Sequence, residues 1–169
     1  LNSPKSGELE GVFERGLYAF KGIPYAAPPV GELRWLPPQP LKPWHGIKSA
    51  KTFGPIAPQN VLPFPGLKAP PEPQSEDCLF LNVFSPGLDD ARRPVMVWIH
   101  GGAFCMGSGS AANYSTGTLA FNGNIVLVTI NYRLGALGFL NLKELTSGKI
   151  PSTGNEGLQD QIAALRWVK

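Results

Sequence analysis

A stretch of small residues, HGGAF at positions 100–104, is the clearest place for chemistry in this sequence, and it follows directly on the apolar run PVMVWI. Gly101, Gly102 and Ala103 carry little or no side chain, so their backbone N–H groups can be approached closely. Backbone donors of this kind can stabilise the negative oxygen that develops during acyl transfer. Taken alone, the stretch is equally compatible with a tight turn whose residues are small because another part of the backbone passes close by.

Side chains that could act as a nucleophile or a base are few. The histidines are His45 and His100, and no G-x-S-x-G stretch of the kind that presents a serine nucleophile occurs. Ser108 and Ser110 stand in GSGS, which is a different pattern. The histidines and cysteines show no zinc-binding spacing, so no structural zinc site is expected. The sequence therefore offers backbone donors without a nucleophile.

Composition argues against several other classes of protein. The 169 residues carry a net charge of +3 with 16% charged residues, and lysine and arginine are scattered, which does not suit a nucleic-acid partner. No run of 18 apolar residues occurs, so no membrane span is predicted. The length suits one globular domain. The two cysteines could form one disulfide, although two buried free thiols are the simpler interpretation.

Two apolar runs must position the HGGAF stretch. Residues 94–100 and 125–133 are nearly continuous apolar runs, which is typical of strands buried on both faces in a parallel sheet. Residues 101–124 are long enough for the crossover that parallel neighbours need. Residues 78–86 predict a further strand, and residues 8–26 predict two short strands around a Glu-Arg-Gly turn.

Two further segments complete the expected architecture. Prolines interrupt every periodic pattern between residues 27 and 74 and predict a loop that packs onto the rest of the protein. Residues 155–169 predict one helix, with Asn155 as its N-cap and an apolar stripe of Leu158, Ile162, Leu165 and Val168. One helix cannot cover two doubly buried strands, so a further segment is expected to cover the sheet.

Five segments, in order, resemble the type-B carboxylesterases, the family that includes the cholinesterases: FKGIPYAAPPVGELRW, SEDCLFLNVFSP, PVMVWIHGGAF, IVLVTINYRLGALGFL and GNEGLQDQIAALRWVK. The most specific of them is SEDCLFLNV, and the resemblance extends from about residue 9 to residue 169. It implies that residues 1–169 are the N-terminal portion of a single α/β-hydrolase catalytic domain. The expected fold is a mixed, mostly parallel sheet flanked by helices and incomplete without a C-terminal segment.

The resemblance also gives the HGGAF residues their expected roles. Gly102 and Ala103 match the two oxyanion-hole positions of this loop, and Gly101 is expected to support its turn. The N–H group of Ala103 is expected to matter, and its methyl group is not. His100 matches a position that supports the loop, so it is not expected to be the catalytic base.

A serine-hydrolase triad is expected to lie elsewhere in the enzyme. In α/β-hydrolases the triad runs serine, then Asp or Glu, then histidine along the chain, and the serine would follow roughly two dozen residues after Lys169. We therefore expect the C-terminal segment of the same enzyme, present as a second chain, to supply the triad. The expected substrate is a small carboxylic ester. The alternative is a catalytically inactive, esterase-like binding or adhesion domain, although the intact HGGAF stretch favours an enzyme.

Two ion pairs are expected on the same grounds. Arg34 with Glu76, and Arg133 with Asp160, match buried ion pairs of the family. A lone buried charge is costly, so pairing is the expected state of each residue. These four residues are expected to be structural and not catalytic.

One departure from the family concerns the cysteine of SEDC, Cys78. The family often pairs it with a cysteine at the position where this sequence has Ala57. Cys78 is therefore expected to be a free, buried thiol. The missing partner favours a reducing, bacterial cytoplasmic setting, with secretion also open.

Overall fold

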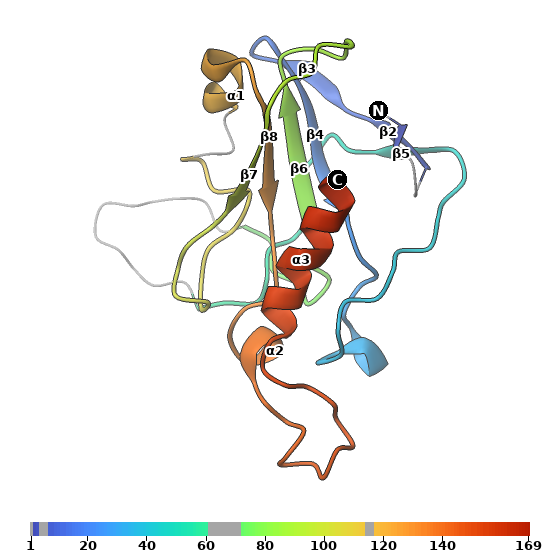
Figure 1. Cartoon of the computed structure of the whole chain (residues 1–169), viewed down its shortest axis with the longest axis vertical. Coiled ribbons are helices and arrows are strands. Elements are labelled where there is room, and N and C mark those ends of the chain that lie inside the picture. The colour runs from blue at the N-terminus through green and yellow to red at the C-terminus, as the bar shows by residue number, and fades with distance from the viewer. Residues whose placement is uncertain (1, 4–6, 61–71, 114–116) are drawn as a thin grey trace.

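A mixed five-stranded sheet forms the centre of the computed structural model, which describes residues 2–3, 7–60, 72–113 and 117–169 (Figure 1). Its strand order is β3-β4-β6-β8-β7. The strands are β3 (Val12–Glu14), β4 (Leu17–Pro24), β6 (Phe80–Ser85), β7 (Val95–Ile99) and β8 (Val126–Ile130). A second sheet contains β1 (Asn2–Ser3), β2 (Gly7–Glu10) and β5 (Ile47–Ser49).

Three α-helices accompany the sheets in the described part of the chain. They are α1 (Thr118–Gly123), α2 (Gly135–Phe139) and α3 (Glu156–Val168), and a short 3-10 turn η1 covers Gly31–Leu33. Helix α1 lies in the connection between β7 and β8, as expected for a crossover between parallel strands. Among the described residues, no helix has the length and apolar character needed to cross a bilayer.

The hairpin between β3 and β4 confirms the turn predicted at Glu-Arg-Gly. Glu14 pairs with Leu17, which leaves a two-residue loop. The loop residues Arg15 and Gly16 have φ values of 52° and 76°. Positive φ at both central residues is the requirement of the type I′ turn, whose twist matches that of the flanking strands.

Strand direction agrees with the sequence prediction only in part. Strands β7 and β8 are parallel, as their apolar runs predict, whereas β3 with β4, β4 with β6, and β6 with β8 are antiparallel. The sheet of this chain is therefore mixed, and the predicted mostly parallel pairing is limited to β7 and β8. An apolar run reports burial on both faces and not strand direction, and β6 is antiparallel to both of its neighbours although it is buried.

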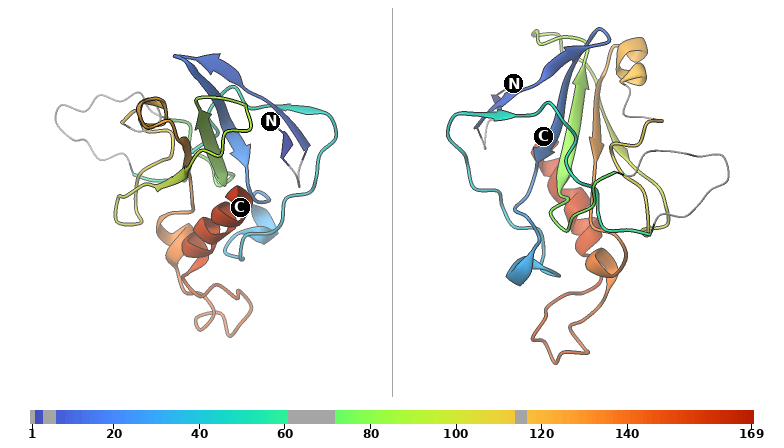
Figure 2. Two further views of the ribbon diagram at one scale, coloured as in Figure 1. Left: turned by 45° about the horizontal axis from the view of Figure 1, so that its top comes forward. Right: turned by 180° about the vertical axis from the view of Figure 1, so that it is seen from behind.

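Strand β7 is the edge of the sheet, and its apolar side chains are exposed on both faces. Exposed fractions are 52% for Val95, 43% for Met96, 40% for Trp98 and 39% for Ile99. Helix α3 packs on the core that β4, β6 and β8 form, and α1 contacts β6 and β8 (Figures 1 and 2). Among the described residues, the sequence prediction of burial therefore holds for β8 and not for β7.

Helix α3 presents a different face to the core from the one its apolar stripe predicts. Leu158, Ile162 and Leu165 are 41–48% exposed, whereas Gly157, Asp160 and Ala164 are buried. Two contacts decide this orientation. Asp160 pairs with Arg133, and a Cβ on Gly157 would lie 2.5 Å from the ring of Phe139. Helix α3 therefore turns small and charged residues inward, and three of the four stripe residues face outward. The fourth, Val168, packs against the core as predicted.

The segment that leads into α3 is held by a carboxylate, and the predicted cap makes no side-chain bond. Asn155 occupies the N-cap position but makes no side-chain capping hydrogen bond. The buried carboxylate of Glu156 accepts hydrogen bonds from the N–H groups of Thr153 and Gly154, at 2.9 and 3.1 Å, and from the hydroxyl of Ser152. A negative charge also suits the positive end of the helix dipole.

Candidate active site: the loop after strand β7

The loop that follows β7 has an unusual backbone at the predicted oxyanion-hole residues. Gly102, Ala103 and Phe104 have φ values of 119°, 52° and 60°. For a non-glycine residue the left-handed region costs roughly 1–2 kcal/mol. Such a conformation persists only when the surrounding contacts impose it, and such residues cluster at active sites, ligand clamps and switch regions.

Hydrogen bonds fix the direction of the two N–H groups predicted to act. The carbonyl of Gly102 accepts from the N–H groups of Cys105 and Met106, at 3.0 and 3.2 Å. Because a trans peptide places C=O and N–H on opposite sides, the N–H of Ala103 points away from this turn. The carbonyl of Gly101 faces Nδ1 of His100 at 2.9 Å, so the N–H of Gly102 points away from that ring. Within the described part of the chain, neither N–H donates a hydrogen bond.

His100 makes the contacts of a residue that supports the loop. Its ring is buried and stacks on Tyr132 with ring centres 4.5 Å apart, and the Tyr132 hydroxyl donates to the His100 carbonyl at 2.9 Å. Burial lowers the pKa of His100, which favours the neutral ring. A carbonyl only accepts hydrogen bonds, so the contact with Gly101 places the proton on Nδ1.

Two glycines of the loop have no room for a side chain. A Cβ on Gly102 would lie 2.0 Å from the carbonyl oxygen of Met106, and a Cβ on Gly107 would lie 2.3 Å from Nδ1 of His100. Gly101 differs, because no described heavy atom lies within 4 Å of the place where its Cβ would be. The expected turn-supporting role of Gly101 stays a prediction, and its observed contribution is the carbonyl that His100 holds.

The loop has further anchors that the sequence did not single out. The side chain of Gln59 forms hydrogen bonds with both backbone groups of Gly107, and the Asn131 amide oxygen accepts from the N–H of Gly109 at 2.7 Å. The N–H of Gly135 donates to the carbonyl of Phe104 at 2.7 Å. Phe104 also contacts Phe139, with ring centres 4.7 Å apart. The loop is thus held by the stretch just after β8 and by Gln59, which lies in the proline-rich segment (residues 27–74).

The serines of GSGS contact a carboxylate. Ser108 donates to one oxygen of Glu72 at 2.8 Å, and Ser110 donates to the other. A serine nucleophile needs a neighbouring base such as histidine to take its proton. The GSGS serines contact Glu72 instead, and His45 lies exposed in the loop before β5. Among the described residues, no group of three or more His, Cys, Asp or Glu side chains is arranged to hold a metal ion.

The cysteines differ from each other in exposure. Both are free thiols, as predicted, but Cys78 is buried and Cys105 is exposed, so the expectation of two buried thiols is wrong for Cys105. Burial also raises the pKa of Cys78 well above its usual value. Its thiol is therefore both shielded and protonated near neutral pH.

Both predicted ion pairs form, but only one is buried. The side chains of Arg133 and Asp160 are 2% and 0% exposed and meet in a two-pronged contact at 2.7 and 2.8 Å. Arg34 and Glu76 meet at 2.6 and 2.7 Å, with exposed fractions of 39% and 29%. The prediction of burial is therefore wrong for the second pair, which lies at the surface of the described chain.

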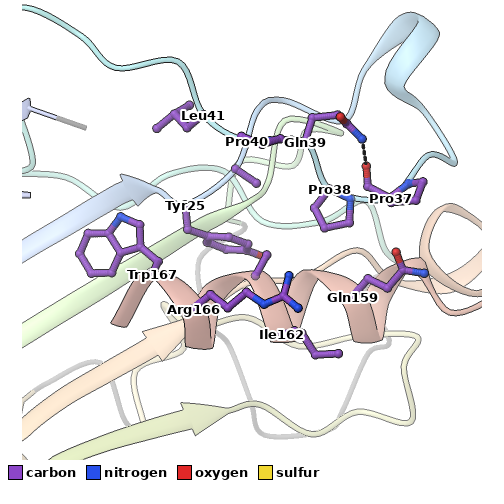
Figure 3. A pocket seen from close by; sticks show the side chains of 12 residues that line it. Tyr25, Pro37, Pro38, Gln39, Pro40, Leu41, Gln159, Ile162, Arg166 and Trp167 are labelled. Carbon is purple, nitrogen blue, oxygen red and sulfur yellow. Dashed lines mark hydrogen bonds between the residues drawn. The ribbon is translucent and has the colours of Figure 1, made fainter. Parts of the chain in front are cut away.

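A separate hollow of about 580 Å³ lies between α3 and the proline-rich segment (Figure 3). Its walls include Arg166 and Trp167 of α3, together with Tyr25 and residues 37–41. It contains no residue of the HGGAF loop. The hollow and the candidate site are therefore distinct places in this chain.

Comparison with known proteins identifies the family of this chain. Residues 3–169 match the sequence profile of the Carboxylesterase family. The chain belongs to the carboxylesterase family. Among curated carboxylesterase relatives, it is 47% identical to phenmedipham hydrolase of Pseudarthrobacter oxydans and 45% identical to para-nitrobenzyl esterase of Bacillus subtilis. Each match covers 96% of this chain, and they cover 32% and 33% of the relatives.

Solved carboxylesterase structures show the same fold. Carboxylesterase EST55 of Geobacillus stearothermophilus matches with a TM-score of 0.85 at 46% identity, covering 97% of this chain and 33% of that chain. A structure titled PNB esterase matches with a TM-score of 0.86 at 44% identity, covering 99% of this chain and 33% of its own. The chain thus has the α/β-hydrolase fold in part, and it spans about a third of the length of the relatives it matches.

Proposed function

We propose that this chain supplies the oxyanion hole of a serine carboxylesterase, through the N–H groups of Gly102 and Ala103. One observation carries the proposal. Two successive N–H groups follow a strand end, their directions are fixed by the contacts of their neighbouring carbonyls, and neither donates to another described residue. Donors that are aimed in advance cost no reorganisation when charge develops on a substrate oxygen.

The reaction is the hydrolysis of a carboxylic ester. A serine from the segment that corresponds to the remaining two-thirds of the relatives attacks the ester carbonyl, and a histidine backed by Asp or Glu takes the serine proton. The carbonyl electron pair moves onto its oxygen, which accepts hydrogen bonds from Gly102, Ala103 and one N–H after the serine. The histidine then protonates the leaving alcohol, and water releases the acid in a second, equivalent step.

An uncharged ester with an apolar group suits the surroundings of the loop. Phe104, which follows the two donors directly, is 48% exposed and packs against Phe139. The name para-nitrobenzyl esterase, carried by a relative at 45% identity, supports the choice of an aromatic ester as the test substrate. No cofactor takes part in this mechanism.

The proposed partner is the C-terminal segment of the same enzyme, carried on a second chain. It would pair with the edge strand β7 and cover the side chains of Met96 and Trp98, which are 43% and 40% exposed in the described chain. The length of the relatives supports such a segment. Native mass spectrometry of the active particle should show an 18.2 kDa chain together with a larger one. A single continuous polypeptide would contradict the second chain and leave the oxyanion-hole proposal intact.

The oxyanion hole is tested by removing one N–H while the side chain is kept; because the exchange also makes the Gly102 carbonyl a weaker acceptor for Cys105 and Met106, thermal stability is measured alongside. In the complete enzyme, replacing Ala103 with its α-hydroxy acid analogue, lactic acid, exchanges the N–H for an oxygen atom and keeps the methyl group. We expect kcat for an aryl ester to fall on the order of 100- to 1000-fold. Proline is unsuitable for this purpose, because it fixes φ near −65° whereas Ala103 has a φ of 52°.

The matched control is Ala103→Gly, which keeps the donor and tolerates positive φ. It should retain most of the activity. Equal turnover by the control and the α-hydroxy variant, at equal thermal stability, would mean that the loop is only a turn. A complete wild-type protein that binds aryl esters without hydrolysing them would instead support the alternative of an inactive binding domain.

A further inference from the structure

The side chain of Gln59 is joined to the oxyanion loop by a reciprocal pair of hydrogen bonds. Its Oε1 accepts from the N–H of Gly107 at 2.7 Å, and its Nε2 donates to the carbonyl of Gly107 at 2.9 Å. The same Nε2 donates to the carbonyl of Ala57 at 3.0 Å. Both ends of the amide are therefore occupied, which fixes the side chain and with it the position of Gly107.

Gly107 in turn lies directly against the groups that aim the Gly102 donor. A Cβ on Gly107 would lie 2.3 Å from Nδ1 of His100 and 2.5 Å from the carbonyl oxygen of Gly101. These two atoms form the contact that turns the N–H of Gly102 away from the His100 ring. A shift of Gly107 by a few tenths of an ångström would therefore press on this contact or leave it unsupported.

We propose that Gln59 is a positioning residue for ester hydrolysis: it holds Gly107 against the His100–Gly101 contact and thereby sets the direction of the Gly102 donor. The inference rests on the proposed function and assigns a role in it to a residue of the proline-rich segment. Gln59 acts through the backbone, so it touches neither substrate nor nucleophile. Its effect belongs to the transition state, where the oxyanion forms, and not to the binding of the neutral ester.

The segment around Gln59 does not need this side chain to stay in place. Ile56 exchanges backbone hydrogen bonds with Pro73 and Ser75, at 2.9 and 3.0 Å. The backbone N–H of Gln59 donates to the side chain of Gln74 at 2.8 Å. Gln74 therefore anchors the same segment through a different bond and offers a control for a merely structural role.

The experiment compares three variants of the complete enzyme with an aryl ester. Gln59→Leu removes both bonds to Gly107 with a side chain of similar size. Gln59→Glu keeps an acceptor for the N–H of Gly107, but as a carboxylate it faces the carbonyl oxygens of Gly107 and Ala57. Gln74→Leu removes the anchor of the segment and leaves the bonds to Gly107 in place.

We expect Gln59→Leu to lower kcat roughly 10- to 100-fold with little change in KM, because a donor displaced by up to 1 Å loses much of its effect. Affinity for an aryl trifluoromethyl ketone, which forms a tetrahedral adduct with an oxyanion, should fall by the same factor. Gln74→Leu should change neither quantity. Gln59→Glu should recover relative to wild type as the pH falls from 8 to 5.5, because the protonated acid can again donate to Gly107.

Two outcomes would overturn the inference alone. In the first outcome, the wild-type enzyme hydrolyses the ester, and Gln59→Leu and Gln74→Leu lower kcat by the same factor. In the second outcome, Gln59→Leu raises KM and leaves the affinity for the ketone unchanged. Thermal melting accompanies each assay, and if Gln59→Leu does not fold, the pH profile of Gln59→Glu decides. A wild-type enzyme without esterase activity would overturn the proposed function itself.

Discussion

Residues of the loop after β7, the proposed oxyanion loop, differ sharply in which substitutions the backbone allows. Gly102 and Gly107 lie where a Cβ would overlap neighbouring atoms, whereas Gly101 faces open space in the described chain. Ala103 and Phe104 hold left-handed conformations that their own side chains disfavour. The loop therefore combines positions that accept only glycine with positions where a small strain is tolerated for the direction of an N–H.

Gly102→Ala should abolish most ester hydrolysis, because its methyl group would lie 2.0 Å from the Met106 carbonyl oxygen and force the loop open. We expect a loss of at least about 100-fold in kcat, comparable to the loss of one donor of the hole. Gly123→Ala in α1 is the matched control, since a methyl group there would meet only Ile125 side-chain atoms, at an ordinary contact distance of 3.6 Å or more. Steady-state kinetics of the two variants at equal thermal stability tests this, and equal losses would contradict it.

Cys78 should react with a thiol reagent only after the protein is unfolded. Its side chain is buried, and burial raises its pKa, so little thiolate is present at neutral pH. The measurement uses the variant Cys105→Ser and follows labelling of the peptide that contains Cys78 by mass spectrometry, with and without denaturant. We expect no label on that peptide in the native protein and full labelling in denaturant. Labelling in the native state, or a Cys78–Cys105 disulfide in the parent protein, would show that the argument is wrong.

The sequence points most directly to a candidate site where a residue's expected role depends on its own backbone. The small residues Gly102 and Ala103 indicate donors without side chains; in the structure both follow a strand end and neither N–H has a described acceptor, and their role in catalysis stays a prediction. Gln59 and Asn131 gave no such signal. Their contacts with the loop join residues 48 and 22 positions apart, and only the tertiary approach of the segments creates them.

Elements show the same division between local pattern and tertiary contact. The strands β6, β7 and β8 and the helix α3 form within the ranges that their apolar patterns predict. The direction of β6 and the inward face of α3 do not follow from those patterns. In α3 the decisive requirement is that Asp160 reaches the buried Arg133, and a hydrophobic stripe contains no information about a charge on another element.

The Arg133–Asp160 pair should be the strongest tie between α3 and the sheet. Asp160→Asn would leave a buried guanidinium without its charge partner, and we expect it to lower the free energy of unfolding by about 3–5 kcal/mol. Urea unfolding of the complete enzyme measures the loss. Glu76→Gln at the surface pair with Arg34 is the matched control and should cost far less, because water solvates both partners. Equal losses for the two variants would contradict the assignment.

At the scale of the whole molecule, the edge strand β7 is the feature that sets how this chain behaves. It has one neighbour, β8, among the described residues, and its side chains are exposed on both faces. An exposed apolar edge strand with free backbone groups is a template for pairing with another strand. In the proposed enzyme that strand comes from the C-terminal segment, and without it the edge is open to other copies.

The 169-residue chain produced alone should therefore associate through β7. Met96 and Trp98 share one face of the strand, and we expect Met96→Lys with Trp98→Lys to shift the chain from aggregates toward the monomer in light scattering. Leu145→Lys is the control, because Leu145 is a singly exposed leucine in a loop and should have no effect. If the control improves solubility as much as the double variant, β7 is not the surface responsible.

The anchors of the oxyanion loop have a consequence for how such an enzyme is made. Tyr132 and Asn131 follow β8 directly, and Gly135 and Phe139 belong to α2, so the contacts that shape the loop are complete by residue 139. All of these contacts lie within this chain. The two donors therefore need no residue of the C-terminal segment to take their directions. In the proposed enzyme this chain carries an oriented oxyanion site before it meets the nucleophile, and reactivity begins only when the C-terminal segment joins it.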